Sequence, residues 1–184
     1  MSRNKNRVCP VEIAGSLDTR LRRWLQNPYR LLKPYIRTGM KVLDVGCGPG
    51  FFSIPMAEMV GPTGQVVAAD LQEGMLDIIR KKIKGTTLEK TIRLHKCEKA
   101  SIAYSETVDF ILAFYMIHEL PDQKNFFDEV YSILRLGGQL LIVEPKMHVS
   151  KNEMKTTIGL AGDAGFQLID LPKVWLSRSA ILKK

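Results

Sequence analysis

The sequence predicts an α/β fold with a seven-stranded, mostly parallel sheet, helices on both faces and an antiparallel last strand. Two observations lead to this prediction. First, short apolar runs of strand length alternate along the chain with longer segments of helical period, as in parallel sheets whose strands are joined by helices. Second, the last two apolar runs, 166–170 and 174–182, are separated by too few residues for a crossover, so they must pair antiparallel.

The expected elements follow one another with short turns between them. The run 108–113 is almost continuously apolar, as a central parallel strand should be. Pro55 lies close to the start of its helix, where it should distort the helix without breaking it. Strands are expected at 40–45, 65–70, 91–96, 108–113, 139–144, 166–170 and 174–182. Helices are expected at 16–26, 29–36, 51–60, 74–84, 123–134 and 151–164, and turns at 61–64 and 137–138.

Composition indicates one domain of 39–184 preceded by a helical arm, 1–38, that is not an independent domain. The arm accounts for nearly all of the net charge of +8, because it holds nine bases and two acids against 18 bases and 17 acids in the rest. Its apolar stripe around Trp24 suits a lid over an acceptor, and its arginines could hold an acidic group, a phosphate or RNA. A solvated helix face packed on the body is the alternative.

Cysteine usage and hydropathy indicate the compartment. Cys9, Cys47 and Cys97 are odd in number and widely spaced, so we expect free thiols, no metal site and a reducing compartment, the cytoplasm. No apolar run approaches ~20 residues and no signal-peptide core is present, so no membrane span is expected. The sequence does not indicate an oligomeric state.

The chemically informative stretch is KVLDVGCGPG at 41–50. A short strand ends there in alternating glycines, which allow backbone amides to approach a ligand. Asp70 ends the next strand, where a carboxylate can accept hydrogen bonds from both hydroxyls of a ribose. The spacing GxGxG departs from the dinucleotide pattern GxGxxG, and no P-loop is present. Asp44 would repel a pyrophosphate but suits an ammonium group, so an amino acid joined to adenosine is indicated.

At this point the sequence resembles the class I S-adenosylmethionine-dependent methyltransferases over about residues 40–182. VLDVGCGPG and Asp70 match the first two motifs of that family, and VDFILAFYMIHEL and LRLGGQLLIVEP look like its fourth-strand and fifth-strand motifs. The resemblance implies a Rossmann-like fold, S-adenosylmethionine as cofactor, Asp44 near its amino group and Asp70 on its ribose. Leu71 and Met75 would flank the adenine, and Glu98 would replace the family's usual contact to the adenine amino group.

Ligands bind to such sheets at the carboxyl ends of the strands, which gathers the loops after the first five strands into one site. The expected cofactor-binding residues are Asp44, Gly46, Cys47, Gly48, Gly50, Asp70, Leu71, Met75, Cys97, Glu98 and Ala113. The candidates for a general base on the acceptor side are Tyr115, His118, Glu119 and Glu144, and His118 and Glu119 could instead only cap the turn before Pro121.

The function expected from this resemblance is methyl transfer to a small-molecule acceptor. The motifs of amino-group nucleic-acid methylases and of cytosine C5 methylases are missing, which disfavours base methylation, and RNA is the weaker acceptor. Two alternatives stay open: a non-catalytic subunit that binds S-adenosylmethionine or RNA, and a transferase that moves a different group from a related cofactor. A thiol-dependent metalloid methylase is a remoter alternative, since no third thiol partner stands in the acceptor loops.

Overall fold

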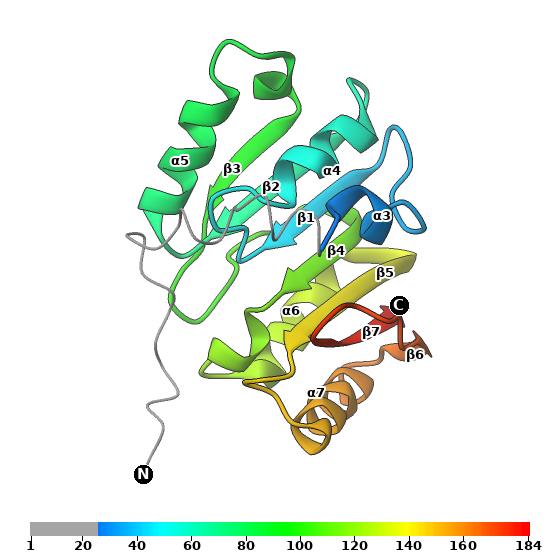
Figure 1. Ribbon diagram of the computed structural model, residues 1–184. Coiled ribbons are helices and arrows are strands. Elements are labelled where there is room, and N and C mark those ends of the chain that lie inside the picture. The colour runs from blue at the N-terminus through cyan, green and yellow to red at the C-terminus, as the bar shows by residue number, and fades with distance from the viewer. Residues whose placement is uncertain (1–25) are drawn as a thin grey trace.

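The computed structural model describes residues 26–184, in which seven strands form one sheet in the order β3-β2-β1-β4-β5-β7-β6 (Figure 1). Neighbouring strands are parallel except β7, which runs antiparallel to both β5 and β6. This confirms the predicted fold class, including its antiparallel last strand. The strands are β1 (Lys41–Val45), β2 (Gln65–Asp70), β3 (Ile92–Lys96), β4 (Val108–Phe114), β5 (Leu134–Pro145), β6 (Gln167–Asp170) and β7 (Ser177–Lys183).

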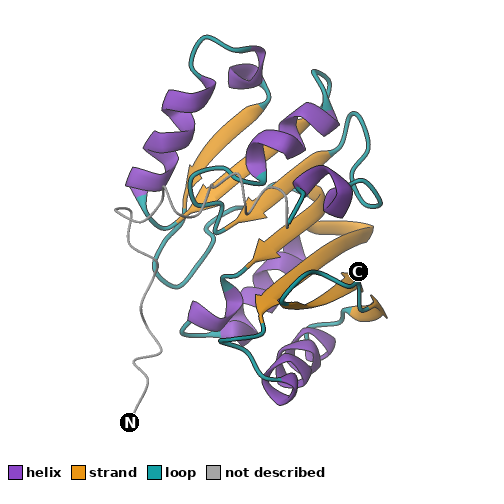
Figure 2. Cartoon of the chain, viewed as in Figure 1, coloured by secondary structure: helices purple, strands orange, loops and turns teal. Residues whose placement is uncertain are grey.

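Helices cover both faces of the sheet, as the alternating pattern predicts (Figure 2). One face packs Leu32, Met56 and Ile79 against the strands, and the other packs Phe127 and Met154. The helices on the first face are α3 (Pro28–Leu32), α4 (Ser53–Val60) and α5 (Glu73–Ile83), and those on the second are α6 (Gln123–Ile133) and α7 (Lys151–Asp163). Two short 3₁₀ helices, η2 (Thr87–Lys90) and η3 (Ile117–Glu119), were not predicted.

Pro55 does not break α4, as predicted, and the predicted distortion stays a prediction. Pro55 is the third residue of that helix. The first N–H groups of a helix have no partner within it, so a proline there removes no hydrogen bond.

Three predicted boundaries are wrong, each for a local reason. The helix expected at 29–36 ends at Leu32, because Pro34 cannot donate the next helical hydrogen bond. Strand β5 begins at Leu134, and a register irregularity opposite Val108 takes up the residues that were predicted to form a turn at 137–138. Strand β7 begins at Ser177 and not at 174, since the residues before it form a loop.

The expected helix at 16–26 and its apolar stripe lie outside the described residues, apart from Gln26. The described part of the arm packs on the body, because Leu32 and Ile36 are buried in the core. The side chain of Gln26 extends to the residue that follows β4, where its Nε2 donates to the hydroxyl of Tyr115 at 2.7 Å. Among the helices of residues 26–184, none has the length and apolar composition required to cross a bilayer.

Candidate active site

The alternating glycines form the turn between β1 and α4, and each has a positive φ: +69° at Gly46, +51° at Gly48 and +84° at Gly50. The N–H groups of Gly46 and Cys47 both donate to the carbonyl of Ala69, which ties the turn to the end of β2. A Cβ on Gly46 or on Gly50 would lie 3.0 Å from the side chain packed against it. A Cβ on Gly48 would meet no atom within 4 Å, although this residue lines a cleft.

We expect Gly48→Ala to weaken cofactor binding with only a modest loss of stability, because its methyl group would enter the space that the ligand needs. The positive φ costs of the order of 1 kcal/mol for a residue with a Cβ. Gly50→Ala carries the same backbone cost and a clash with Ile79 as well. Urea unfolding and calorimetry with S-adenosylmethionine on both variants should therefore separate the two effects. Equal stability losses in the two variants would contradict this reading.

Asp70, at the end of β2, is buried and already holds two backbone amides. The N–H of Gly48 donates to its Oδ2 at 2.9 Å, and the N–H of Gln72 donates to its Oδ1 at 2.8 Å. Burial raises the pKa of Asp70, and these amides partly offset the rise by stabilising the charged form. A carboxylate oxygen can accept more than one hydrogen bond, so Asp70 retains capacity for ligand hydroxyls while it fixes the shape of the turn.

Asp44, near the end of β1, is almost completely buried, and the hydroxyl of Ser53 donates to its Oδ2 at 2.5 Å. Ser53 is the first residue of α4, so the turn itself brings these two groups together. Burial raises the pKa of Asp44 to about 7, and the nearby charge of Asp70 contributes to the rise. A buried carboxylate without a charged partner is a suitable place for a cation, which would restore its ordinary ionisation.

We expect Asp44→Asn to stabilise the unliganded protein at pH 8 more than at pH 5. The folded-state pKa of about 7 lies above the ordinary 3.8, so Asp44 favours folding at low pH and loses that contribution as the pH rises to about 7. Between pH 5 and pH 8 the difference corresponds to at most roughly 3 kcal/mol, because the folded-state carboxyl stays protonated over about two of these pH units. Urea unfolding of both proteins at the two pH values measures it, and a pH-independent difference would contradict the raised pKa.

The same substitution should change how cofactor binding depends on pH. If the ammonium group of the cofactor binds ionised Asp44, affinity for the wild-type protein should fall as the pH falls from 7 to 5, because a proton then competes with the ligand. In Asp44→Asn the affinity should be lower at pH 7 and nearly constant over this range. Calorimetry in two buffers of different ionisation enthalpy would also detect the proton released by the wild-type protein.

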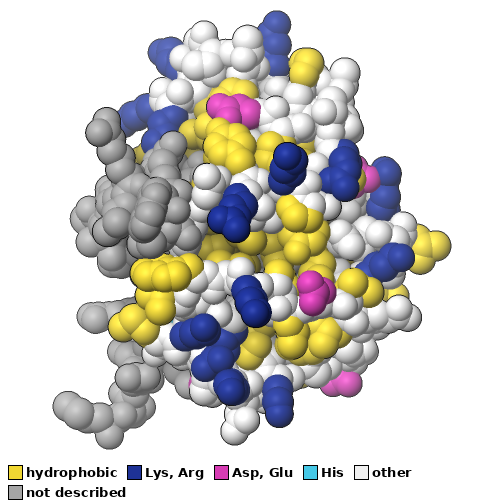
Figure 3. Space-filling model, turned by 45° about the vertical axis from the view of Figure 1, so that its right-hand side comes forward, with side chains coloured by type: hydrophobic (Ala, Val, Ile, Leu, Met, Phe, Trp, Pro, Cys, Tyr) yellow, Lys and Arg dark blue, Asp and Glu magenta, His cyan; other side chains and the backbone are white. Residues whose placement is uncertain are grey.

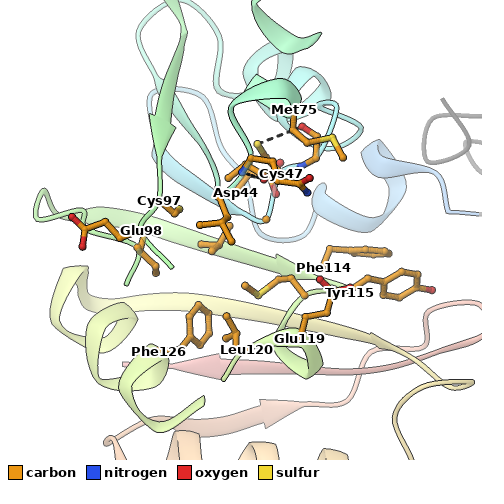
Figure 4. Close-up of a pocket in the computed structure, with 18 of the residues that line it drawn as sticks. Asp44, Cys47, Met75, Cys97, Glu98, Phe114, Tyr115, Glu119, Leu120 and Phe126 are labelled. Atoms are coloured by element: carbon orange, nitrogen blue, oxygen red, sulfur yellow. Dashed lines mark hydrogen bonds between the residues drawn. The ribbon is translucent and has the colours of Figure 1, made fainter. Parts of the chain in front are cut away.

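A cleft of about 380 Å³ opens at the carboxyl ends of the strands, within the usual size of small-molecule sites. Figure 4 shows Met75 and Cys47 on one side of it and Glu119, Leu120 and Phe126 on the other. Most of the residues that the sequence predicts to bind the cofactor line this cleft. The predicted cofactor-binding residues that line the cleft are Asp44, Gly46, Cys47, Gly48, Asp70, Leu71, Met75, Cys97 and Glu98.

Two of the predicted cofactor-binding residues do not line the cleft, and a third lines it with its carboxylate directed away from the middle. Gly50 and Ala113 do not line the cleft; Gly50 packs on Ile79, and Ala113 is buried within β4. Glu98 lines the cleft but is exposed, and in Figure 4 its carboxylate points away from the middle.

The two thiols in the cleft are not reactive. Burial raises the pKa of Cys97 to about 12 and that of Cys47 well above its ordinary value, so both thiols stay protonated at neutral pH.

The four candidates for a base separate into two groups. Glu119 lines the cleft, and burial raises its pKa. Tyr115 also lines it, but its hydroxyl points away from the cleft toward Gln26 and Ser177, whose Oγ lies at 2.5 Å (Figure 4). His118 and Glu144 do not line the cleft.

His118 and Glu144 instead form a pair with each other. The Nδ1 of His118 contacts one oxygen of buried Glu144, and the N–H of Ile117 donates to the other at 2.9 Å. Burial lowers the pKa of His118, but the hydrogen bond and the charge of Glu144 raise it by more, so the net shift is upward. This pair holds η3 in place and thereby positions the neighbouring Glu119.

Sequence reasoning placed the loop after β4 at the site but singled out none of the apolar residues that line the acceptor half of the cleft. This half is lined by Phe114, Met116, Leu120, Phe126 and Glu129. Helix α6 contributes Phe126 and Glu129. Only the helical period of α6 is visible in the sequence, and that period does not show which turn of the helix reaches the cleft. The sequence therefore gives no signal that Phe126 and Glu129 reach the cleft.

The match to known families agrees with this geometry. A family model described as a methyltransferase domain matches residues 42–138, more than half of the chain. The chain belongs to this methyltransferase family. The matched segment runs from β1 into β5 and so contains the glycine turn, Asp70 and Glu119.

Solved structures of methyltransferases share the complete fold. The chain superimposes on a SAM-dependent methyltransferase from Aquifex aeolicus with a TM-score of 0.84 at 28% identity, covering 95% of this chain and 98% of that one. A putative S-adenosyl-L-methionine-dependent methyltransferase from Methanococcus maripaludis gives 0.78 at 19% identity, covering 100% and 97%, which supports the fold alone. The class I fold implied by the sequence is thus confirmed.

Curated methyltransferases are similar to this chain over about half of their own length. A demethylmenaquinone methyltransferase from Lactobacillus johnsonii is 31% identical over 122 residues, which are 66% of this chain and 49% of that protein. A ubiquinone/menaquinone biosynthesis C-methyltransferase from Haemophilus ducreyi is 31% identical over 110 residues, which are 59% and 42%. The chain therefore spans about half the length of the curated relatives it matches.

Proposed function

We propose that this methyltransferase transfers the methyl group of S-adenosylmethionine to a small, largely apolar acceptor that carries a ring. The observation that carries the proposal is one continuous cleft with two chemically different halves. Buried Asp44 and Asp70 lie at the glycine turn, where they suit an ammonium group and a ribose. Aromatic and aliphatic side chains line the other half, where an apolar ring would be removed from water.

The cofactor would lie across the tips of β1 and β2. Asp44 would accept from its amino group, Asp70 from the ribose hydroxyls, and Leu71 and Met75 would flank the adenine. Both acids are buried and lie beside the open position at Gly48. The sulfonium would then point into the apolar half, because that is where the cleft continues beyond the turn.

The acceptor class is supported by the lining and by the relatives. Phe114, Met116 and Phe126 offer flat and flexible apolar contacts to a ring. The two curated relatives described above are named for methylation of demethylmenaquinone and for ubiquinone and menaquinone biosynthesis, so quinol-type rings are the first acceptors to test. Among the described residues that line the cleft, Lys99 is the one base, whereas a stacking platform for single-stranded RNA combines aromatic rings with several bases.

Methyl transfer from a sulfonium is an in-line displacement, in which the acceptor atom forms a bond to the methyl carbon as the carbon–sulfur bond breaks. Alignment of the two reactants supplies most of the rate, up to ~7–11 kcal/mol. A ring carbon or hydroxyl must also lose a proton, and a base contributes about 10²–10⁴-fold. Of the four candidate bases, Glu119 is the carboxylate that lines the cleft, and burial raises its pKa, which makes it a stronger base than an exposed glutamate.

Calorimetry with S-adenosylmethionine, its demethylated product and NAD tests the cofactor. We expect micromolar-range binding of the first two and none of NAD; tighter binding of NAD would refute the assignment. A labelled-methyl assay with quinols, other hydroxylated aromatics and RNA then tests the acceptor. Binding without transfer to any of these classes would instead favour a non-catalytic cofactor-binding subunit.

A further inference from the structure

Exposed apolar side chains gather on the loop between β6 and β7 and on the loop after β5. Met147 is 82% exposed and Trp175 is 52% exposed. Leu171 and Leu176 are exposed to about the same extent as Trp175, at 57% and 50%. The two loops lie side by side, because the N–H of Lys146 donates to the carbonyl of Leu176 at 3.0 Å. Large apolar residues that are exposed together on one face usually mark an interaction surface.

Basic side chains surround these apolar residues. Helix α3 lies close to the 171–176 loop, because both neighbour the hydroxyl of Tyr115. Gln26, just before α3, and Ser177, just after the loop, each form a hydrogen bond with this hydroxyl. The segments 28–37, 146–148 and 170–176 together carry five bases and one acid, Asp170. Figure 3 shows one face of the molecule on which hydrophobic side chains gather among many lysines and arginines and a few acidic side chains. We call the surface formed by these three segments the basic-apolar face; its members are Arg30, Lys33, Lys146, Met147, Leu171, Lys173, Trp175 and Leu176.

We propose that the basic-apolar face docks on an anionic lipid surface. Leucine, methionine and tryptophan can enter the boundary between headgroups and acyl chains, while lysines and arginines contact the anionic headgroups. Tryptophan is particularly suited to this boundary, because its ring is apolar and its N–H is polar. A second copy of this chain fits less well, since two such faces would bring like charges together.

The position of the face gives docking a consequence for the site. Ser177 adjoins Leu176 and bonds to Tyr115, which lines the cleft, so the face borders the acceptor side of the site. A protein docked in this way would bring its cleft close to the lipid surface, where apolar acceptors accumulate. This consequence rests on the proposed function, whereas the docking itself does not.

Vesicle flotation with the full chain tests the proposal without any turnover. We expect the protein to float with vesicles of equal parts phosphatidylcholine and phosphatidylglycerol, and to float much less with phosphatidylcholine alone or in high salt. The double variant Lys146→Glu, Lys173→Glu should reduce partition to the anionic vesicles at least about tenfold. The double variant Lys81→Glu, Lys90→Glu, which replaces two exposed lysines on α5 and η2 outside this face, is the matched charge control and should have little effect.

Apolar insertion is tested in the same way. Met147→Ser with Leu171→Ser should lower partition, whereas Leu136→Ser, which removes a leucine 88% exposed at the opposite end of β5, should not. With Trp24→Phe as background, Trp175 is the remaining tryptophan, and its emission should shift to the blue on anionic vesicles. S-adenosylmethionine affinity, measured on every variant, should stay unchanged and shows that each variant is folded.

Several results would overturn the proposal. Flotation that is unaffected by all changes in the face, or a constant Trp175 emission, would place any lipid binding elsewhere, for example on the basic arm. A doubled mass in light scattering that the Met147→Ser, Leu171→Ser variant restores to the monomer would assign the face to a second copy. Tighter binding of RNA than of vesicles would assign it to nucleic acid. Loss of cofactor binding in the wild-type protein would refute the proposed function and leave the vesicle result intact.

Discussion

Glu119→Gln is expected to lower the rate of methyl transfer by about 10²–10⁴-fold while leaving the affinity for S-adenosylmethionine unchanged. The substitution keeps the shape of the side chain and removes its ability to accept a proton. Glu119 lies across the cleft from the glycine turn (Figure 4), so it does not hold the cofactor. Single-turnover rates with labelled cofactor, alongside calorimetry, separate the two quantities.

The pH profile provides a second readout for Glu119. Because burial raises its pKa above the ordinary 4.5, the wild-type rate should fall as the pH falls through that raised value. The Glu119→Gln variant should lose this limb of the profile and keep its low rate throughout. A rate that stays high in the variant, or an unchanged acid limb, would show that no proton passes through Glu119.

The other candidates supply matched controls. Tyr115→Phe removes a hydroxyl that bonds to Gln26 and Ser177 outside the cleft, so we expect a small effect on the rate. His118→Asn disturbs the pair with Glu144 and thereby the position of η3, so its loss of rate should come with a loss of stability. A larger, purely kinetic effect of His118→Asn than of Glu119→Gln would reverse their assigned roles.

The sequence predicts the glycine turn and the places of its two acids well, because backbone requirements dominate there. Gly46, Gly48 and Gly50 adopt positive φ values that few other residues tolerate, and Asp44 and Asp70 stand at strand ends, whose place a parallel sheet determines. Each of these constraints is local in the sequence. The antiparallel last strand is predictable for a similar reason, since its short connection allows no crossover.

The acceptor side depends on side-chain directions that no local pattern encodes. His118 and Glu119 are adjacent in the sequence, but the 3₁₀ turn of η3 directs one toward Glu144 and the other into the cleft. Phe126 belongs to the ordinary apolar stripe of α6 and lines the cleft only because that helix begins beside it. The early start of β5 also escaped prediction, because its glycines form an irregular strand and not a turn.

Asp70→Ala is expected to weaken binding of S-adenosylmethionine by about 10- to 150-fold, which corresponds to roughly 1.5–3 kcal/mol for hydrogen bonds to a charged group. The substitution removes the acceptor for the ribose hydroxyls. It also releases the N–H groups of Gly48 and Gln72, so the turn loses a shape that the ligand requires. Calorimetry measures the affinity, and Asp77→Ala, an exposed acid on α5, is the matched control.

Ligand fragments distinguish the two roles of Asp70. Adenosine carries the ribose hydroxyls and methionine does not, so Asp70→Ala should weaken adenosine strongly if direct contact dominates. If the shape of the turn dominates, methionine should lose affinity as well, because Asp44 stands at the same turn. Asp70→Asn keeps one acceptor oxygen for an amide but presents an NH₂ group to the other, so it should lie between wild type and alanine. An Asp70→Ala protein that binds every ligand normally would place the ribose elsewhere and remove the basis of the proposed cofactor position.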